Sequence, residues 1–486
     1  MTHDPNHGDL APEAIHSWLT RAADLAASYL AGGVEAHRVL PAIEPGAVRA
    51  AFPAEPPAQP EPMDAIFDDY RHLVEPNVTH WNHPGFLAYF SITGSAPGVA
   101  AETLAAALNV NAMLWRTGPA AVEMEELVCD WVRGMLGLPE VFRGHINDTA
   151  SSSTLVALTA ARHALPGAEI RRRGLAGRSD LGPLTVYCSD QAHSSVDKAA
   201  IVLGLGSDQV RRIASDSAFR MDAAALAEAI AADREAGRRP MAVVATAGTT
   251  STTSVDPLAE IADLCAEQDL WLHVDAAYAG AAAIDPDHRP LFAGWERADS
   301  IVTNPHKWLF APIDCSLLWV RDPANLKAAF SLVPDYLTSD EDEVTHLMDL
   351  GFQLGRRFRA LKLWMVIRAF GVDGMRRRIR AHCEWAERLA ARIDAHPLLE
   401  VVAPVPFSVV CFRLVGSEGH GDDEANRRLL DAINADGRFL LSHTVLGGRY
   451  TLRIAIGNLR TTEAHLDTLF DLVADAAGRI ATGDPR

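Results

Sequence analysis

Short apolar runs alternate with longer amphipathic segments between residues 96 and 370. Apolar runs of strand length, each followed by polar residues or glycine, occupy residues 184–188, 241–246, 270–274 and 300–303. Apolar strands that alternate with helices, such as the one predicted over 257–268, are typical of an α/β fold with a mainly parallel central sheet and helices on both faces. Ligands bind beyond the carboxyl ends of such strands, so we expect the chemistry there.

The first 95 residues do not show this alternation. Residues 12–30 carry apolar side chains at helical spacing and stop at Gly32-Gly33, which predicts a helix. Residues 41–62 are rich in proline, alanine and glutamate and have no core of their own. Such a stretch must pack on the body or on a partner subunit. We therefore interpret residues 1–95 as an N-terminal helical arm or dimerisation segment.

The pattern changes again after residue 370. A helix with a basic side is expected over 374–394, and it is followed by strand-like segments at 408–414 and 450–456 and helical segments at 423–435 and 462–478. We interpret residues 371–486 as a small C-terminal α+β domain behind a large α/β domain over residues 96–370. A chain of 486 residues is too long for one compact core, which agrees with this division.

Composition narrows the class of protein. The formal net charge of −19 argues against a nucleic-acid or anionic-membrane partner. The chain has no apolar run of membrane-spanning length, and its first nine residues lack the layout of a secretory signal. Six scattered cysteines without a Cys-x-x-Cys pair indicate reduced thiols, and the 19 histidines form no metal-binding motif. We expect a soluble, cytoplasmic protein without a metal site.

Two polar residues each follow an apolar run. Asp275 follows residues 270–274, and Lys307 lies in Asn304-Pro305-His306-Lys307-Trp308 after residues 300–303. Taken singly, Asp275 could also be a helix-capping residue, and Lys307 could also be a lysine on the surface. Together they place a carboxylate and an amine at one edge of the sheet. Pyridoxal phosphate needs both, because a lysine binds its aldehyde as an imine and an aspartate keeps its pyridine nitrogen protonated.

A phosphate site should accompany this pair. The hydroxyl-rich run 149–154 opens a helical stretch, where free backbone N–H groups and the helix dipole favour an anion. The same run also fits a capped helix without a ligand. No Gly-x-Gly-x-x-Gly or Gly-Lys-Ser/Thr loop occurs, which argues against a dinucleotide or a nucleoside triphosphate. His193, after residues 184–188, fits either a ring stacked on a planar cofactor or a solvent-facing residue.

With these residues in place, the chain resembles the group II pyridoxal-phosphate-dependent decarboxylases, most closely the aromatic-L-amino-acid decarboxylase branch. The matching segments keep the order and similar spacing of that family: His80-Trp81-Asn82-His83-Pro84 with Ala88-Tyr89-Phe90, and residues 189–195, 243–250, 273–280, 304–308 and 354–359. The resemblance implies the fold type I architecture of pyridoxal-phosphate enzymes. It also implies a homodimer in which the N-terminal arm wraps the partner and the active sites form at the subunit interface.

The resemblance assigns roles around the cofactor. Lys307 would form the internal aldimine, and Asp275 would pair with the pyridinium nitrogen. His193 would stack on one face of the ring and Ala277 would pack on it, with Thr246 near both cofactor and substrate. The phosphate would be held by Thr149, Ala150, Ser151, Asn304 and His306.

The same resemblance assigns the substrate pocket. Its lining would comprise Trp81, Tyr89 and Phe90, together with Asn111 and Met113 at positions reached from the partner subunit. Gly355 matches a position where, among plant relatives, glycine accompanies indole substrates and serine accompanies phenols. The missing side chain leaves room for a larger ring and favours tryptophan over tyrosine, phenylalanine or DOPA, although one pocket position discriminates by only a few kcal/mol. The apolar lining argues against a glutamate-type substrate.

The reaction depends on a tyrosine. Tyr336 matches the residue on a mobile loop that, in this family, returns a proton to Cα after CO₂ has left. Relatives with phenylalanine there, or with asparagine at the position of His193, tend to make aldehydes by oxidative deamination. The presence of both residues favours plain decarboxylation to the amine. The alternatives are an aromatic aldehyde synthase and a non-enzymatic cofactor-binding protein; Lys307, Asp275 and Tyr336 together count against the latter.

Two residues depart from the family pattern. Ile92 stands where animal relatives have a threonine hydroxyl near the substrate carboxylate, so recognition of that carboxylate is expected to differ. Asp148 stands in the phosphate loop where glycine is common. A carboxylate beside a phosphate is unfavourable, so we expect Asp148 to cap a backbone group or to face outward.

Overall fold

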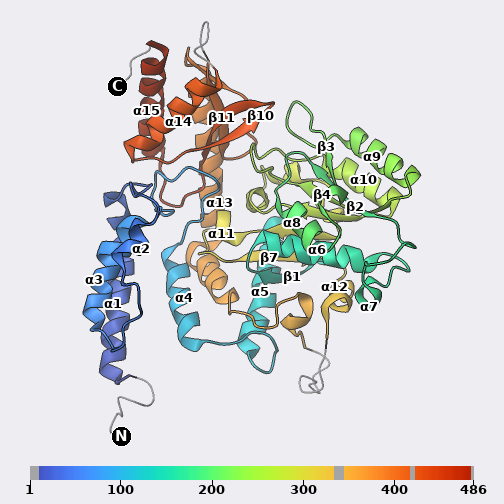
Figure 1. Ribbon diagram of the computed structural model, residues 1–486, viewed down its shortest axis with the longest axis horizontal. Coiled ribbons are helices and arrows are strands. Elements are labelled where there is room, and N and C mark those ends of the chain that lie inside the picture. The colour runs from blue at the N-terminus through green and yellow to red at the C-terminus, as the bar shows by residue number, and fades with distance from the viewer. Residues whose placement is uncertain (1–9, 333–343, 416–421, 483–486) are drawn as a thin grey trace.

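The centre of the protein is a seven-stranded sheet, seen in a computed structural model that describes residues 10–332, 344–415 and 422–482 (Figure 1). The strand order is β1-β7-β6-β5-β4-β2-β3. Of these strands, β7 alone runs against its neighbours, and the other neighbouring pairs are parallel. The strands are β1 (Arg143–Asn147), β2 (Leu184–Ser189), β3 (Val210–Ile213), β4 (Arg239–Thr246), β5 (Trp271–Asp275), β6 (Ser300–Thr303) and β7 (Ser316–Val320).

Helices cover both faces of this sheet. Along β4, Val243 and Ala245 belong to one buried cluster, whereas Ala242 and Val244 belong to another, because successive side chains point to opposite faces. The first face is covered by α5 (Pro119–Leu136), α9 (Ala223–Glu235), α10 (Leu258–Gln268) and α13 (Ala360–Asp394). The second is covered by α6 (Ala150–Ala164), α7 (Ile170–Arg173), α8 (Ser195–Val202) and α12 (Pro323–Phe330). The predicted α/β fold is confirmed.

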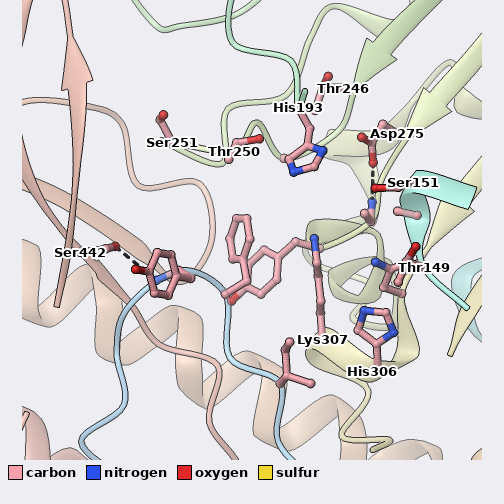
Figure 2. Close-up of a pocket in the computed structure, with 18 of the residues that line it drawn as sticks. Thr149, Ser151, His193, Thr246, Thr250, Ser251, Asp275, His306, Lys307 and Ser442 are labelled. Carbon is pink, nitrogen blue, oxygen red and sulfur yellow. Dashed lines mark hydrogen bonds between the residues drawn. The ribbon is translucent and has the colours of Figure 1, made fainter. Parts of the chain in front are cut away.

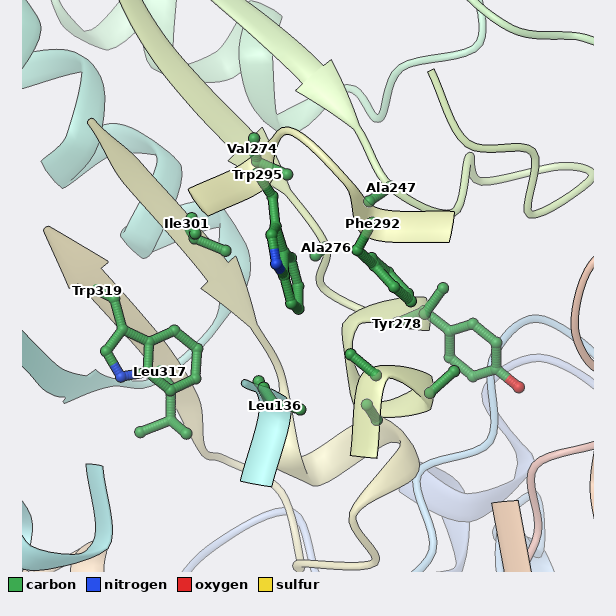
Figure 3. Close-up of a cluster of buried hydrophobic side chains, with 14 of the residues drawn as sticks. Leu136, Ala247, Val274, Ala276, Tyr278, Phe292, Trp295, Ile301, Leu317 and Trp319 are labelled. Carbon is green, nitrogen blue, oxygen red and sulfur yellow. The ribbon is translucent and has the colours of Figure 1, made fainter. Parts of the chain in front are cut away.

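The first face carries the larger core, which includes several aromatic rings (Figure 3). Phe292 is fully buried, and its ring centroid lies 4.7 Å from that of Trp295. Tyr278 extends this packing toward the carboxyl edge of the sheet: its ring stacks on Phe90 at 3.9 Å and on Trp308 at 4.6 Å. The rings that support the functional site are therefore continuous with the core.

The C-terminal part forms a separate antiparallel sheet in the order β10-β11-β9-β8. Its elements are β8 (Leu399–Val401), β9 (Val409–Leu414), α14 (Asp423–Asp436), β10 (Ser442–Leu446), β11 (Arg449–Ala455) and α15 (Glu463–Thr482). The helix expected over 374–394 begins earlier, at residue 360. At Gly371 the backbone of α13 leaves the helical region, with φ +63°, and the helix then resumes. Gly371 therefore marks a kink between two helical segments, and the second of these covers the predicted range.

The N-terminal region stands at one side of the molecule, where α1 (Pro12–Leu30), α2 (Ala47–Ala51), α3 (Met63–Asp69) and α4 (Ala96–Leu108) are seen in blue (Figure 1). The segment that follows α3 pairs with the C-terminal sheet: Phe86 forms a bridge with Leu440, and the N–H of Ala455 donates to the Leu87 carbonyl. That pairing brings residues 85–90 to the carboxyl edge of the large sheet. Among the described helices, none has the length and apolar character needed to cross a membrane.

Candidate active site

The residues that follow the carboxyl ends of β1, β2, β4, β5 and β6 meet around one cavity of about 440 Å³ (Figure 2). Parallel strands present these ends at the same edge, so residues far apart in sequence converge. The cavity brings together most of the predicted site: Trp81, Tyr89, Phe90, Thr149, Ala150, Ser151, His193, Thr246, Asp275, Ala277, Asn304, His306 and Lys307. Ile92 also lines it.

Lys307 lies on the short helix α11 (Pro305–Trp308), directly after β6. Its Nζ atom is 5.0 Å from the centroid of the Phe90 ring. Burial lowers the pKa of the amine, nearby Asp275 opposes that shift, and Arg453 adds to it. At a given pH, a lysine with a lowered pKa is neutral for a larger fraction of the time, and the neutral amine is the nucleophilic form.

Asp275 ends β5 and is nearly buried, with 6% of its surface exposed. Its Oδ1 accepts a hydrogen bond of 3.1 Å from the N–H of Ala277. The strand ends are tied together because Thr246 pairs with Asp275 in the sheet and the N–H of Ala247 donates to the Asp275 carbonyl. The carboxylate therefore has a fixed position at the inner end of the cavity.

The ring of His193 lies against the same cavity, close to Thr246 in Figure 2. Its Nδ1 accepts a hydrogen bond of 3.1 Å from the N–H of Ser195. Partial burial lowers the pKa of the ring, an effect that Asp275 opposes. With Nδ1 acting as acceptor, the neutral ring carries its proton on Nε2.

Another part of the cavity lining is rich in hydrogen-bond donors. Thr149 is the N-cap residue of α6, so backbone N–H groups of the first helical turn face this part. His306 accepts a hydrogen bond of 2.9 Å at Nδ1 from the N–H of Cys315, and burial lowers its pKa to about 3. His306 is therefore neutral, with a proton on Nε2 that it can donate.

Three polar atoms of residues that line this cavity are buried without a partner among the described residues: Thr246 Oγ1, Asn304 Oδ1 and Arg453 Nη2. A buried polar group without a hydrogen bond is costly, and such atoms usually mark a place for a missing ligand group. An amine, a carboxylate and a phosphate-sized donor cluster surround them. These residues fit pyridoxal phosphate. No group of three or more metal-binding side chains occurs in the described part of the chain.

Asp148 does not line the cavity. Its Oδ1 accepts a hydrogen bond of 2.6 Å from the N–H of Thr149, and its Oδ2 lies 3.5 Å from Gln353 Nε2. The expectation that this carboxylate caps a backbone group is confirmed. One N–H at the phosphate end is consequently already occupied by a resident carboxylate.

The aromatic wall of the cavity, formed by Trp81, Tyr89 and Phe90, is held by the C-terminal sheet. The rings of Trp81 and Tyr89 stack with centroids 6.0 Å apart. Tyr89 has a left-handed backbone, with φ +52°, which is unusual for a residue with a side chain. Its N–H donates to Ser442 Oγ over 3.2 Å, and its carbonyl accepts from the Arg453 guanidinium, so both of its peptide groups are fixed.

Three predicted substrate residues lie outside this cavity. Asn111 Oδ1 accepts a hydrogen bond of 2.9 Å from the N–H of Arg356, next to Gly355, and the Met113 carbonyl accepts from the N–H of Met348. Asn111 and Gly355 are exposed, and a Cβ added at Gly355 would meet no atom within 4 Å. Asn111 and Gly355 lie close together on a surface of the chain outside this cavity. Tyr336 falls outside the described residues.

Arg453 of β11 also lines the cavity, although no sequence motif predicts it there. Only 3% of its surface is exposed, and its guanidinium lies 4.5 Å from the Phe90 ring centroid. Nε donates to the Ser251 carbonyl over 2.9 Å, whereas Nη2 has no partner in the described structure. Burial lowers the pKa of this arginine. The available signal was an arginine inside the otherwise uncharged strand 450–456.

Comparison with known proteins agrees with this geometry. Residues 45–415 match the model of the pyridoxal-dependent decarboxylase conserved domain. Tryptophan decarboxylase 2 of Oryza sativa is 40% identical over 473 residues, covering 95% of this chain and 94% of the relative. Phenylacetaldehyde synthase of Arabidopsis thaliana is 39% identical, covering 91% and 92%. The crystal structure of Oryza sativa TDC with PLP and tryptamine superimposes with a TM-score of 0.93 at 38% identity, covering 99% and 100%.

Proposed function

The chain belongs to the pyridoxal-dependent decarboxylase family, and we propose how its residues carry out the reaction of that family. It is a pyridoxal-phosphate-dependent carboxy-lyase that converts an aromatic L-amino acid to its amine. The structural observation that supports this assignment is the convergence of Lys307 and Asp275 on one cavity, beside three buried polar atoms that have no partner among the described residues.

The chain would hold the cofactor at both ends. Lys307 would hold its aldehyde through the amine, and Asp275 would keep a proton on its ring nitrogen. His193 would stack on the ring, Ala277 would pack on it and Thr246 would lie nearby. The phosphate would be bound by Thr149, Ala150, Ser151, Asn304 and His306. When bound, pyridoxal phosphate supplies a sink for the electron pair released with CO₂.

The remaining cavity residues orient the substrate. The aromatic wall of Trp81, Tyr89 and Phe90 packs against its ring. The buried Arg453 would bind its α-carboxylate through Nη2, because that atom has no partner among the described residues and a buried cation favours an anion. This contact supplies carboxylate recognition that Ile92, lacking a hydroxyl, does not. After CO₂ leaves, a proton returns to Cα, and the family resemblance gives this role to Tyr336.

The protein would act as a homodimer. No residue of α1 is buried in the single chain, and Leu19 and Leu108 are 56% and 61% exposed. Phe352 and Leu354, beside Gly355, are also more than half exposed. A partner subunit that covers these apolar side chains would bring Asn111, Met113 and Gly355 to its own cavity. Light scattering of the purified protein tests the dimer.

A reducing, cytoplasmic location is consistent with the thiols. All six cysteines are buried and none is paired. Thiols persist in this state where glutathione and thioredoxin keep them reduced. Fractionation of the native cells tests this location.

Product analysis tests the activity. The purified protein with pyridoxal phosphate is incubated with L-tryptophan, L-tyrosine, L-phenylalanine, L-DOPA, L-histidine and L-glutamate, and products are identified by mass spectrometry. We expect amine from an aromatic substrate, with tryptophan preferred because Gly355 leaves room for its ring. Aldehyde with peroxide and ammonia would instead identify an aldehyde synthase and would refute the role of Tyr336. No product from any of the six would contradict the substrate class.

A further inference from the structure

Asp256 lies behind the cavity, and it binds the backbone of Thr246 from both sides. It is 2% exposed and does not line the cavity. Its Oδ2 accepts a hydrogen bond of 2.7 Å from the N–H of Thr246, and its own N–H donates to the Thr246 carbonyl over 3.0 Å. Its Oδ1 accepts a second hydrogen bond of 2.7 Å from the N–H of Met221. Asp256 thus satisfies both the backbone N–H and the backbone carbonyl of Thr246, the last residue of β4.

This contact closes a loop that forms part of the cavity. Residues 247–255 leave β4 and return to Asp256, and on the way Gly248, Thr250 and Ser251 line the cavity. The loop is closely packed, since a Cβ added at Gly248 would lie 2.4 Å from the Cβ of Ala279. The loop has contacts of its own, because Ala247 forms a bridge with Val255 and the N–H groups of Gly248 and Thr249 donate to the Ser254 carbonyl. Asp256 adds the hydrogen bonds that hold Thr246, where the loop leaves β4.

The residue that Asp256 holds is part of the cofactor site proposed above. Thr246 pairs with Asp275 in the sheet, and its Oγ1 is one of the three buried cavity atoms that have no partner among the described residues. A displacement at Thr246 would move this hydroxyl and would strain the neighbouring strand end that carries Asp275. Catalytic groups must be held within a fraction of an ångström, so a support of this kind affects binding directly.

We propose that Asp256 is a positioning residue for the cofactor: it fixes Thr246, and through Thr246 the edge of the sheet that binds pyridoxal phosphate. The inference rests on the proposed function, because it presumes that Thr246 meets the cofactor. Asp256 itself touches neither cofactor nor substrate. Its effect should therefore appear in cofactor affinity and in the visible absorbance of the bound cofactor.

The chain offers a matched control at the other edge of the same sheet. Asp299 accepts a hydrogen bond of 2.7 Å at Oδ2 from the N–H of Leu272, and its own N–H donates to the Leu272 carbonyl over 2.9 Å. This arrangement repeats the contact of Asp256 with Thr246. Leu272 lies near the start of β5, and neither it nor Asp299 lines the cavity. Removing the Asp299 carboxylate tests the structural cost without touching the cofactor site.

The experiment compares Asp256→Asn with Asp299→Asn in the full-length protein. For each, the thermal midpoint of the cofactor-free protein, the dissociation constant of pyridoxal phosphate and the visible spectrum of the loaded protein are measured. We expect both variants to lose thermal stability. Only Asp256→Asn should weaken cofactor binding, by about tenfold, which corresponds to one misplaced hydrogen bond. It should also shift the visible absorbance maximum.

A double variant shows whether the effect passes through Thr246. In a Thr246→Val background the hydroxyl is absent, so adding Asp256→Asn should change the dissociation constant by less than about twofold. If the two residues acted independently, their effects on the binding free energy would add, and Asp256→Asn would weaken binding by the same factor in both backgrounds. If Asp256→Asn does not accumulate as folded protein, Asp256→Glu, which displaces the carboxylate by one methylene, replaces it.

Equal dissociation constants and spectra for Asp256→Asn, Asp299→Asn and the wild type would overturn the inference while leaving the proposed function intact. A wild-type protein that binds no pyridoxal phosphate would instead refute the proposed function. The two failures are therefore distinguishable.

Discussion

Replacement of Arg453 by methionine tests how the substrate carboxylate is recognised. Methionine keeps much of the apolar length but removes the charge and every donor. The lost contact is a charge-assisted hydrogen bond in a buried site, worth about 1.5–3 kcal/mol. At about 1.4 kcal/mol for each factor of ten, KM for the amino acid should rise about 10- to 100-fold.

Arg453 also supports the aromatic wall, so its two effects must be separated. Its guanidinium donates to the Tyr89 carbonyl and lies over Phe90. The product amine provides the separation, because it has the aromatic ring and no carboxylate. Its inhibition constant should change by less than about threefold in Arg453→Met if the carboxylate is the main partner. Ser442→Ala, which removes the other contact of Tyr89, measures the wall effect alone.

Initial-rate measurements of CO₂ release, with the amine as inhibitor, decide the question. The reasoning is refuted if the inhibition constant of the amine rises as much as KM for the amino acid. Arg453 would then act only by holding Tyr89 and Phe90. An unchanged KM would show that the carboxylate is bound elsewhere in the cavity.

Three further predictions concern specificity and stability. Gly355→Ser should leave the thermal midpoint unchanged, because an added Cβ meets no atom within 4 Å, yet lower the preference for tryptophan over tyrosine by about tenfold; an unchanged ratio would remove Gly355 from the substrate pocket. Phe292→Ala, in the fully buried core, should cost about 3–5 kcal/mol of unfolding free energy in urea titrations, and a cost below about 1 kcal/mol would contradict the tight packing in Figure 3. Burial lowers the pKa of His382 to about 3, so below pH 6.5 the unfolded chain takes up a proton that the folded chain does not. Stability is therefore lost as pH falls, and between pH 7 and 5 the wild type should lose about 2 kcal/mol more than His382→Gln; parallel pH curves would show that His382 is not held neutral.

Local patterns in the sequence were enough to predict the α/β fold and part of the cavity, namely Asp275, Lys307, His193 and the hydroxyl-rich run 149–154. Apolar runs located β2, β4, β5 and β6, because strands buried on both faces leave a continuous apolar signal. Asp275 and Lys307 were predicted to share an edge because parallel strands end on the same side. The family resemblance added the other predicted cavity residues, which are Thr246, Ala277, Asn304 and His306 and the aromatic residues Trp81, Tyr89 and Phe90.

Other features depend on contacts that no local pattern records. In the sequence, Arg453 is a single charged residue in an apolar strand. It is buried beside the cavity only because β11 packs against residues 85–90. The sequence gives no sign that Asp256 differs from any other loop aspartate, because its hydrogen bonds to Thr246 exist only in the folded chain. Asn111 and Gly355 come together through the hydrogen bond from Arg356, but on a surface outside this cavity.

The sequence by itself determined which residue types are present and where strands and helices form, since periodicity and motif order are properties of neighbouring positions. The tertiary structure decided which side chains are desolvated and which buried polar groups have no hydrogen-bond partner among the described residues. Lys307, Arg453 and Thr246 have their special properties because distant segments exclude solvent around them. Desolvation depends on everything packed around a group, so it is fixed only when the whole chain has folded.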